Sequence, residues 1–265
     1  MSQTFRDGLL TGKTAFVSGS SSGIGLRIAE RFAEAGARVM LHGRKIDKLD
    51  AAVSRILEAG GTASSVAADV RDYPAMVDAM ARTRALFGEI DILVCGAAGN
   101  FPAPVMAMSP NGFKAVVDID LLGTYHTVRA AYEHLRKPGA CVISLSANHA
   151  SVPYAAQAHV CAAKAGLERL TQCLAVEWGP EGIRANVINP GPIDGTEGMM
   201  RLAPTPEARQ AVIASVPLRR LGTRDDIANL ALFLASDAAA YIHGAVLICD
   251  GGHIHSGVGP PLGSA

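Results

Sequence analysis

The sequence predicts an α/β protein, with one doubly wound sheet of seven parallel strands and helices packed on both faces. Short apolar runs alternate with longer segments of helical period, which is typical of strand–helix crossovers. The apolar runs, such as ILVC and AVLIC, are continuous because strands of a parallel sheet are buried on both faces. Residues 1–265 fit a single domain, and we find neither an internal repeat nor a linker.

The expected strands and helices alternate along the chain. The strands are expected at residues 14–18, 38–42, 63–67, 90–95, 140–144, 184–188 and 245–249. The helices between them are expected at 24–35, 45–59, 73–87, 112–135, 158–178 and 224–234. Residues 190–206 are rich in Gly and Pro, and we interpret them as a lid over a site. Residues 253–265 have no periodic pattern and predict an irregular tail.

The composition indicates a folded protein without strong electrostatic partners. Apolar residues make up 49% of the chain and charged residues 18%, so a large core is available. The 24 basic and 24 acidic side chains balance, which gives no reason to expect nucleic acid or an anionic membrane as partner. The chain has no apolar run near the roughly 20 residues of a membrane span, and no signal peptide. With five cysteines and no CxxC pair, we expect reduced thiols in a cytoplasmic protein.

The segment 18–25, SGSSSGIG, joins the first strand to the first helix. Gly19 permits the tight turn, Gly23 lets the backbone approach a pyrophosphate, and Gly25 allows the helix to pack closely on the strand. The helix N-terminus supplies aligned N–H donors for phosphate oxygens. This strand–turn–helix context predicts a dinucleotide bound by a Rossmann fold. The other residues of the turn expected at the cofactor are Ser21, Ser22 and Ile24.

The second strand is followed by Gly43, Arg44 and Lys45, without a carboxylate. An acidic residue there normally binds the free ribose 2′-hydroxyl of NAD(H). Gly43 leaves space and Arg44 offers a planar fork of donors, which suits the 2′-phosphate of NADP(H). We therefore predict NADP(H); the alternative is that Arg44 and Lys45 only solvate a helix start. Asp69 is placed to contact the adenine, and Val70 beside it is also expected at the cofactor.

Four motifs resemble the short-chain dehydrogenase/reductase family over nearly the whole chain. They are SGSSSGIG at 18–25, LVCGAAG at 93–99, Lys164 in a long helix, and NPGPI at 189–193. The resemblance implies that Ala97, Gly99 and Lys164 lie at the cofactor, with Lys164 on the nicotinamide ribose. It also implies cofactor contacts from the loop after the sixth strand, through Pro190, Gly191, Pro192, Ile193 and Thr196.

One family residue is missing. Members usually carry Tyr-x-x-x-Lys with the tyrosine as general acid, but the residue four positions before Lys164 is Val160. Ketone reduction leaves negative charge on an oxygen that must be protonated directly. Reduction of a C=C bond conjugated to a thioester instead moves the charge to the thioester oxygen and protonates carbon, so oxyanion donors and a water suffice. The absence of the tyrosine favours the second reaction.

Longer strings resemble one branch of the family, the NADPH-dependent 2,4-dienoyl-CoA reductases of the peroxisomal type. The strings are AAGNF at 97–101, SPN at 109–111, QxH at 157–159, AVEWGP at 175–180 and PGPIxGTEG at 190–198. Those enzymes also lack the tyrosine. The resemblance implies hydride transfer from NADPH to a 2,4-dienoyl-CoA, giving a 3-enoyl-CoA in the oxidation of unsaturated fatty acids, by a homotetramer. The chain ends LGSA without a peroxisomal signal, so we expect a bacterial-type cytoplasm.

We predict catalytic roles for Lys164, Asp120 and Ser146. Lys164 lies in an apolar helix start, CAAKAGL, where it would hold positive charge beside the reacting centre. Asp120 stands where the family usually has Asn and would order a water that delivers the proton, unless it is only a helix-surface carboxylate. Ser146 would donate to the oxyanion, or it only ends its strand in a turn.

The acyl-CoA substrate needs basic groups for its phosphates and an apolar channel for its chain. Arg71 and Arg201 are the candidates for the phosphates, and Phe101 for the channel; the alternatives are solvated charges and a packed aromatic ring. His159 is a substrate-side candidate or a structural histidine. The set expected at the substrate is Arg71, Asn100, Phe101, Ser109, Asn111, His159 and Arg201.

Two other functions stay open from the sequence. One is an alcohol–carbonyl oxidoreductase with a relocated general acid. The other is a non-catalytic NADP-binding protein, against which the retained Lys164 and the Arg71 and Arg201 pair argue. We expect no metal, because His253 and His255 have no third ligand nearby in the sequence.

Overall fold

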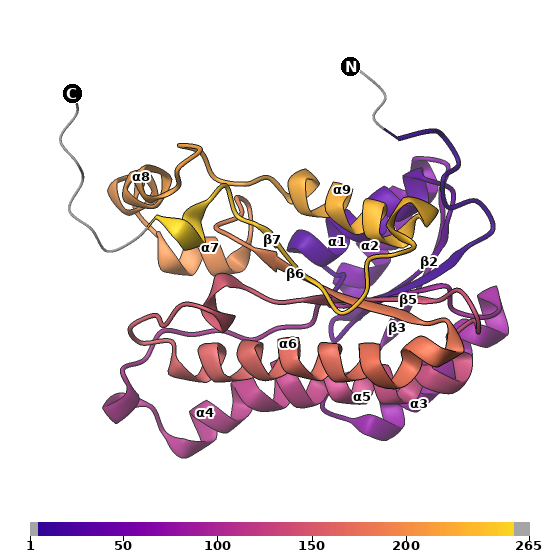
Figure 1. Ribbon diagram of the computed structural model, residues 1–265, viewed down its shortest axis with the longest axis horizontal. Coiled ribbons are helices and arrows are strands. Elements are labelled where there is room, and N and C mark those ends of the chain that lie inside the picture. The colour runs from indigo at the N-terminus through magenta and orange to yellow at the C-terminus, as the bar shows by residue number, and fades with distance from the viewer. Residues whose placement is uncertain (1–4, 257–265) are drawn as a thin grey trace.

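Seven parallel strands form the central sheet of the computed structural model, which describes residues 5–256 (Figure 1). Their order is β3-β2-β1-β4-β5-β6-β7, so the direction of winding reverses between β1 and β4. The strands are β1 (Thr14–Ser18), β2 (Arg38–Gly43), β3 (Thr62–Ala67), β4 (Ile92–Cys95), β5 (Cys141–Leu145), β6 (Arg184–Pro190) and β7 (Val246–Cys249). The predicted fold class, a single doubly wound Rossmann-type domain, is confirmed.

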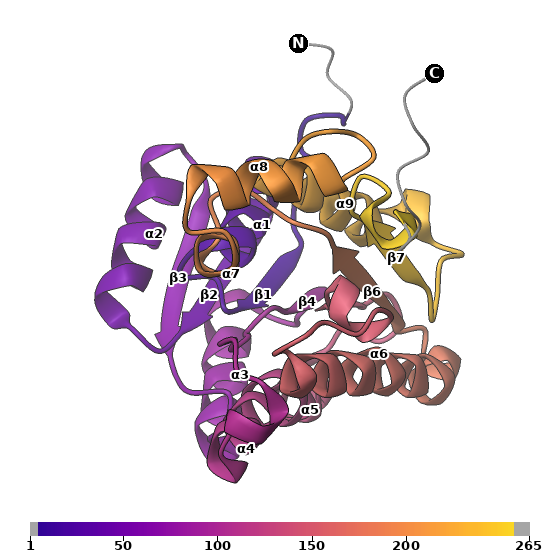
Figure 2. The same ribbon diagram turned by 90° about the vertical axis from the view of Figure 1, so that its left-hand side faces the viewer.

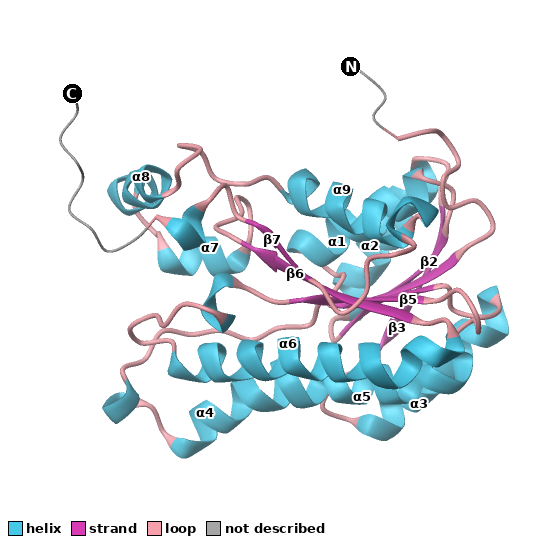
Figure 3. Cartoon of the chain, in the orientation of Figure 1, coloured by secondary structure: helices cyan, strands magenta, loops and turns pink. Residues whose placement is uncertain are grey.

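Helices cover both faces of the sheet, as Figures 1 and 3 show. The helices on one face are α1 (Gly23–Glu34), α2 (Ile46–Glu58) and α9 (Arg224–Ala235). Those on the other face are α3 (Tyr73–Phe87), α4 (Pro110–Val117), α5 (Gly123–Ala131) and α6 (Ala158–Trp178). Right-handed crossovers between parallel strands require this two-sided arrangement.

Each face of the sheet has its own hydrophobic core, because alternate strand residues point to opposite faces. On β1, Val17 packs in the core that contains Phe32 of α1 and Leu232 of α9. Its neighbour Phe16 packs in the second core, with Met80 of α3. This burial of both faces explains why the strands read as continuous apolar runs.

The long helix predicted at residues 112–135 is interrupted. Between α4 and α5 the chain forms one π-helical turn, Asp118–Leu122, and a 3₁₀ turn, Tyr132–His134, follows α5. The hydrogen bonds of a π turn span one residue more than those of an α-helix, and such turns often occur at functional sites. Here the turn carries Asp120, whose side chain is buried.

The stretch 190–206, predicted to be irregular, contains a short helix α7 (Glu197–Leu202) and leads into α8 (Pro206–Ser215). Both helices start at a threonine whose side chain accepts from the backbone, Thr196 from Met199 N and Thr205 from Ala208 N. At the end of the described chain, His253–His255 form a 3₁₀ turn, where an irregular tail was predicted. Residues 257–265 of that tail lie outside the described residues.

Candidate active site

A cleft of about 910 Å³ opens at the carboxyl ends of the strands, below α7 and α8, on the edge that faces the viewer in Figure 2. Every residue predicted at the cofactor lines this cleft, from Gly19 in the first turn to Thr196 before α7. Asp120, Ser146, Asn100 and Arg201 also line it. Ligands of doubly wound sheets bind at this edge, next to the point where the strand order reverses.

The turn after β1 has the shape that a bound phosphate requires. Gly19 has φ +69°, and a Cβ there would lie 2.6 Å from the Gly96 oxygen, so only glycine fits. A Cβ on Gly25 would lie 2.5 Å from the Gly19 oxygen, which lets α1 start close to β1. Gly23 has φ +62° with open space around its Cβ position. The N-cap residue Ser22 makes no side-chain capping bond, which leaves the first N–H groups of α1 without a side-chain cap.

At the end of β2, three basic residues line the cleft: Arg44, Lys45 and Lys48. All three side chains are exposed. Gly43 packs beside the Ser21 side chain, where a Cβ would lie 3.3 Å from the Ser21 Oγ. The buried strand residue before them, His42, has no hydrogen-bond partner on either ring nitrogen. Burial lowers the pKa of His42 to about 4, so the ring is neutral at pH 7.

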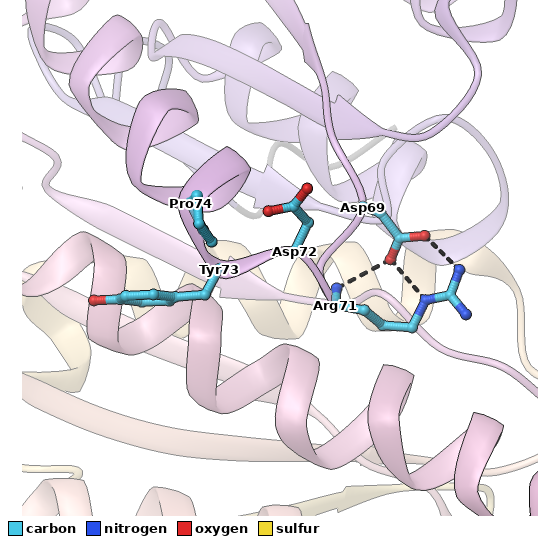
Figure 4. A pocket seen from close by; sticks show the side chains of 5 residues that line it. All are labelled: Asp69, Arg71, Asp72, Tyr73 and Pro74. Atoms are coloured by element: carbon cyan, nitrogen blue, oxygen red, sulfur yellow. Dashed lines mark hydrogen bonds and ion pairs between the residues drawn. The ribbon is translucent and has the colours of Figure 1, made fainter.

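Asp69 and Arg71 form an ion pair at the side of the cleft (Figure 4). The Arg71 guanidinium donates to Asp69 through Nε at 3.0 Å and through Nη2 at 2.6 Å. Hydrogen bonding to Arg71 lowers the pKa of Asp69 to about 2, with a smaller contribution from the charge of Arg44. Arg71 lines a neighbouring shallow pocket with Asp72, Tyr73 and Pro74 rather than the main cleft. Its predicted contact with the substrate phosphates stays a prediction.

Lys164 and Asp120 meet in the interior of the cleft wall. Lys164 Nζ donates to the Leu145 oxygen at 2.9 Å and lies 3.3 Å from Asp120 Oδ2. Asp120 Oδ1 accepts from the Gly99 N–H at 2.6 Å, while Oδ2 accepts no hydrogen bond. Both side chains are almost fully buried, and the π turn places Asp120 at this depth. The alternative that Asp120 is a helix-surface carboxylate is therefore wrong.

Ser146, just after β5, is bound to a residue that the sequence analysis did not select. The Ser146 hydroxyl donates to Glu168 Oε1 at 2.6 Å, and the buried Asn189 side chain donates to the same oxygen at 2.9 Å. A serine hydroxyl has one proton to donate. Because this proton is bonded to Glu168, it is not available to an oxyanion in the cleft. The signal for Glu168 was its position one helical turn after Lys164, on the same face of α6.

Val160 lies in the cleft wall where the family usually has a tyrosine. It is 3% exposed and packs with Val116 and Ala163, so the wall beside Lys164 is apolar there. The rings of His149 and Tyr154 also line the cleft, and they stack at 4.3 Å between centroids. Sequence reasoning missed Tyr154, because no periodic pattern marks the loop between β5 and α6.

Besides Arg71, four residues predicted at the substrate do not line the cleft. His159 is fully buried, and its ring meets that of Phe101 edge to face at 4.5 Å. Ser109 caps α4 by accepting from Gly112 N, and Asn111 follows it in the first turn. Ser109 and Asn111 are exposed, and the substrate contacts of all four residues stay predictions.

The α7 segment closes the cleft from one side. Arg201 of α7 donates to the Asn100 oxygen at 2.7 Å, which joins this segment to the loop after β4. Arg209 of α8 binds both carboxylate oxygens of Asp194, at 2.8 and 2.7 Å. The Arg201 bond joins the predicted lid to the loop after β4, and the Arg209–Asp194 pair joins it to α8.

Metal and membrane features are not found within residues 5–256. This part of the chain contains no cluster of three or more His, Cys, Asp or Glu side chains arranged for a metal ion. Asp250 instead accepts from Asn148 Nδ2 at 3.1 Å and from the backbone of its own turn. No helix in the same range has the length and apolar character needed to cross a bilayer.

The fold and the cleft together define a dinucleotide-binding α/β protein. The phosphate-shaped turn, the uncapped start of α1 and the basic group after β2 suit a nicotinamide dinucleotide laid across the strand ends. A buried lysine at the far end of the same cleft adds a charged group where a nicotinamide ribose would lie.

Comparison with known proteins agrees with this class. A family model described as enoyl-(acyl carrier protein) reductase matches residues 19–253. A peroxisomal 2,4-dienoyl-CoA reductase of Pongo abelii is 42% identical over 246 residues, which is 92% of this chain and 84% of that protein. A probable 2,4-dienoyl-CoA reductase of Bacillus subtilis is 41% identical over 243 residues, 91% of this chain and 96% of that protein.

Solved structures are also similar. A dehydrogenase/reductase from Sinorhizobium meliloti superposes with a TM-score of 0.87 and 36% identity, over 92% of this chain and 96% of that one. A gluconate 5-dehydrogenase from Burkholderia cenocepacia, in complex with NADP and tartrate, has a TM-score of 0.88 and 29% identity, over 94% and 97%. The chain belongs to the short-chain dehydrogenase/reductase family and is an oxidoreductase that uses a nicotinamide cofactor.

Proposed function

We propose that this enzyme reduces a 2,4-dienoyl-CoA to a 3-enoyl-CoA with NADPH, in the oxidation of unsaturated fatty acids. Relatives named as (3E)-enoyl-CoA-producing 2,4-dienoyl-CoA reductases, from Pongo abelii and yeast, are 42% and 40% identical to this chain over most of its length. The Bacillus relative, 41% identical, is named as a 2,4-dienoyl-CoA reductase that produces a (2E)-enoyl-CoA. The single observation that carries the proposal is the side chain of Val160, which lines the cleft four residues before Lys164. An apolar group there provides no proton to a ketone oxygen, whereas a conjugated thioester needs none at its oxygen.

The reaction adds hydride to the δ-carbon and a proton to the α-carbon. NADPH supplies the hydride when it is bound. Lys164 keeps a positive charge in the buried wall, paired with Asp120 at 3.3 Å. Asp120 Oδ2 is without a hydrogen bond and can hold a water, which gives a proton to the α-carbon as the charge returns from the thioester oxygen.

We also propose NADPH rather than NADH as the hydride donor. Gly43 provides space after β2, and the exposed Arg44, Lys45 and Lys48 surround that position. A 2′-phosphate placed among these cations would be held by charge-assisted hydrogen bonds. Direct measurement of the two dissociation constants tests this: NADPH should bind more tightly than NADH, and equal affinities would refute it.

The experiment that tests the reaction is NADPH consumption with a 2,4-dienoyl-CoA, beside a panel of ketones and a 2-enoyl-CoA. We expect rapid oxidation of NADPH with the dienoyl thioester only, and a 3-enoyl thioester as the product by mass spectrometry and NMR. Activity confined to the ketones would favour a carbonyl reductase and overturn the proposal.

A homotetramer is the assembly that we propose. Several large apolar side chains are exposed on the α4–α5 and α6 side of the molecule, which favours burial against another subunit. They are Phe113, Leu122, Tyr125 and Val176. Light scattering of the purified enzyme tests the proposal, and a monomeric mass would contradict it. The cytoplasmic location stays a prediction.

A further inference from the structure

A half-buried imidazole in the cleft wall has no hydrogen-bond partner within residues 5–256. His149 lies in the loop between β5 and α6, in a 3₁₀ turn formed by Asn148–Ala150. The residue lines the cleft together with Ser146, Val160 and Lys164. Both of its ring nitrogens are buried, and neither has a hydrogen-bond partner. A buried donor without an acceptor raises the free energy of the folded state. We therefore expect a ligand in the cleft to supply the hydrogen-bond partner of this imidazole.

The imidazole is neutral at physiological pH. Burial, together with the nearby charges of Lys164 and His159, lowers the pKa of His149 to about 4. A neutral imidazole has one N–H donor and one acceptor. The neutral ring can therefore donate a hydrogen bond to a developing negative charge with no change in its protonation state.

We propose that His149 donates a hydrogen bond to the thioester oxygen and stabilises the negative charge that forms there. This inference rests on the proposed function. Hydride addition at the δ-carbon moves the γ,δ electron pair to the β,γ bond and the α,β pair to the bond between the α-carbon and the carbonyl carbon. The carbonyl π pair then goes to oxygen, opposite the N–H of His149. When a water protonates the α-carbon, the electron pair returns from oxygen to the carbonyl bond. The hydroxide that remains takes a proton from solvent, so the reaction consumes one proton in total, and the imidazole keeps its own proton throughout.

The need for such a donor follows from the rest of the wall. Val160 provides none, and the Ser146 proton is engaged by Glu168 at 2.6 Å. Lys164 is already bound to the Leu145 oxygen and paired with Asp120. His149 is a cleft residue beside them whose ring donor has no acceptor among the described residues.

Tyr154 positions the imidazole. Its ring stacks on that of His149 at an interplanar angle of 26°. The loop that carries both rings ends at Ala156, which has φ +60° and whose oxygen accepts from Ala103 N at 2.9 Å. A non-glycine residue in this conformation is strained, and such strain is held where the surrounding structure fixes a functional geometry. The stacking partner acts through its ring rather than its hydroxyl.

The first test replaces His149 by Phe, which keeps the stacked ring and removes the donor. We expect kcat with a 2,4-dienoyl-CoA to fall about 10²-fold or more, the range for loss of one oxyanion donor. The Kd for NADPH and the thermal midpoint should remain near those of the wild type. The matched control is His134→Phe, which removes another half-buried histidine with an unpartnered ring nitrogen, in the 3₁₀ turn after α5. An unchanged kcat in His149→Phe would overturn the inference.

The second test needs no turnover. Polarisation of the thioester carbonyl should shift the absorbance of a bound dienoyl-CoA to longer wavelength in the wild type and in His134→Phe. The shift should be lost in His149→Phe. If His149→Phe keeps the full shift, the donor to the oxygen is another group. This readout separates the two proposals, because a wild type that binds and shifts the thioester but never oxidises NADPH refutes the reaction and leaves His149 supported.

The positioning role of Tyr154 is tested by two variants. Tyr154→Phe should keep kcat within about twofold, since the stacked ring remains. Tyr154→Ala should lower kcat and the absorbance shift together, with the Kd for NADPH unchanged. An equal loss of kcat in both variants would show that the hydroxyl is the group that matters, and it would overturn the role assigned to the ring.

Discussion

At the scale of single residues, the charge around Gly43 decides how the cofactor is selected. Arg44 is exposed in the cleft wall, and its own charge contributes to the low pKa of Asp69. A guanidinium that is not held by a bidentate protein partner keeps its donors for a ligand. Arg71, by contrast, already spends two of its donors on Asp69.

The substitution Arg44→Gln should weaken NADPH binding by roughly 10- to 100-fold, the range for one charge-assisted hydrogen bond. NADH binding should stay within about twofold, because NADH lacks the 2′-phosphate. Titration of the intrinsic fluorescence of each reduced cofactor measures both constants. Arg55→Gln, at another exposed arginine of α2, serves as the matched control. Equal losses for both cofactors would contradict the role of Arg44.

His42 makes the stability of the fold depend on pH. Its pKa is about 4 in the folded protein, below the ordinary value of 6.5. The unfolded chain therefore binds more protons, and stability that is complete above pH 6.5 is lost as the pH falls toward 4. The difference between the ordinary pKa and the pKa in the folded protein corresponds to about 3 kcal/mol. Urea unfolding at several pH values should show this loss in the wild type, and a smaller loss in His42→Leu.

The residues of the site differ in how far the sequence predicts them. The phosphate turn and the loop after β6 were predictable because their glycines and prolines impose backbone shapes that few other residues permit. Tyr154 was not, because its role depends on side chains brought together by tertiary packing. For Glu168 the sequence shows only its position one helical turn after Lys164, and not the contact with Ser146. Local spacing does not indicate that Ser146 would donate to Glu168 rather than into the cleft.

At the scale of the elements, α9 has the most complete N-terminus. The Thr223 side chain accepts from Asp226 N at 3.1 Å, and Asp226 accepts in return from Thr223 N at 2.7 Å. This capping box satisfies two backbone donors at once. The helix packs on α1, and its apolar face is part of the core that includes Leu232.

Removing that cap should loosen the helix without touching the cleft. Thr223→Ala is expected to lower the free energy of unfolding by about 1 kcal/mol, while Thr223→Ser keeps most of it. Urea denaturation gives both values, and the Kd for NADPH provides a check on the site. If the alanine variant is as stable as the wild type, the cap contributes nothing in this context.

Some element boundaries could not be predicted from the local sequence pattern. The apolar period through residues 112–135 is continuous, so it predicts one helix, yet Asp120 is buried and bonded to Gly99 and Lys164 within a π turn. Those contacts join residues distant in the chain, which a local period does not record. For α8 the signal was present: Thr205 before Pro206 is a common helix start, but the Gly and Pro content of the preceding loop obscured it.

At the scale of the whole molecule, the cofactor should contribute to stability. Its predicted contacts come from the turns after β1, β2, β3, β4 and β6 and from α6, so they exist together only in the folded state. NADPH at 100 times its Kd should therefore add about 2.7 kcal/mol to the free energy of unfolding. Differential scanning calorimetry with and without NADPH measures the change. A midpoint that does not rise with NADPH would show that the cleft does not bind it.

The strand order also determines when, during folding, the chain becomes able to bind its cofactor. The phosphate turn near residue 19 and the wall residue at 253 belong to one cleft, although nearly the whole chain separates them. Such long-range contacts form slowly, because each crossover must close before the next strand pairs. Neither half of the polypeptide alone contains all the residues that line the cleft. The fluorescence increase of NADPH on binding, followed during refolding, would therefore report the rate at which the last strand joins the sheet.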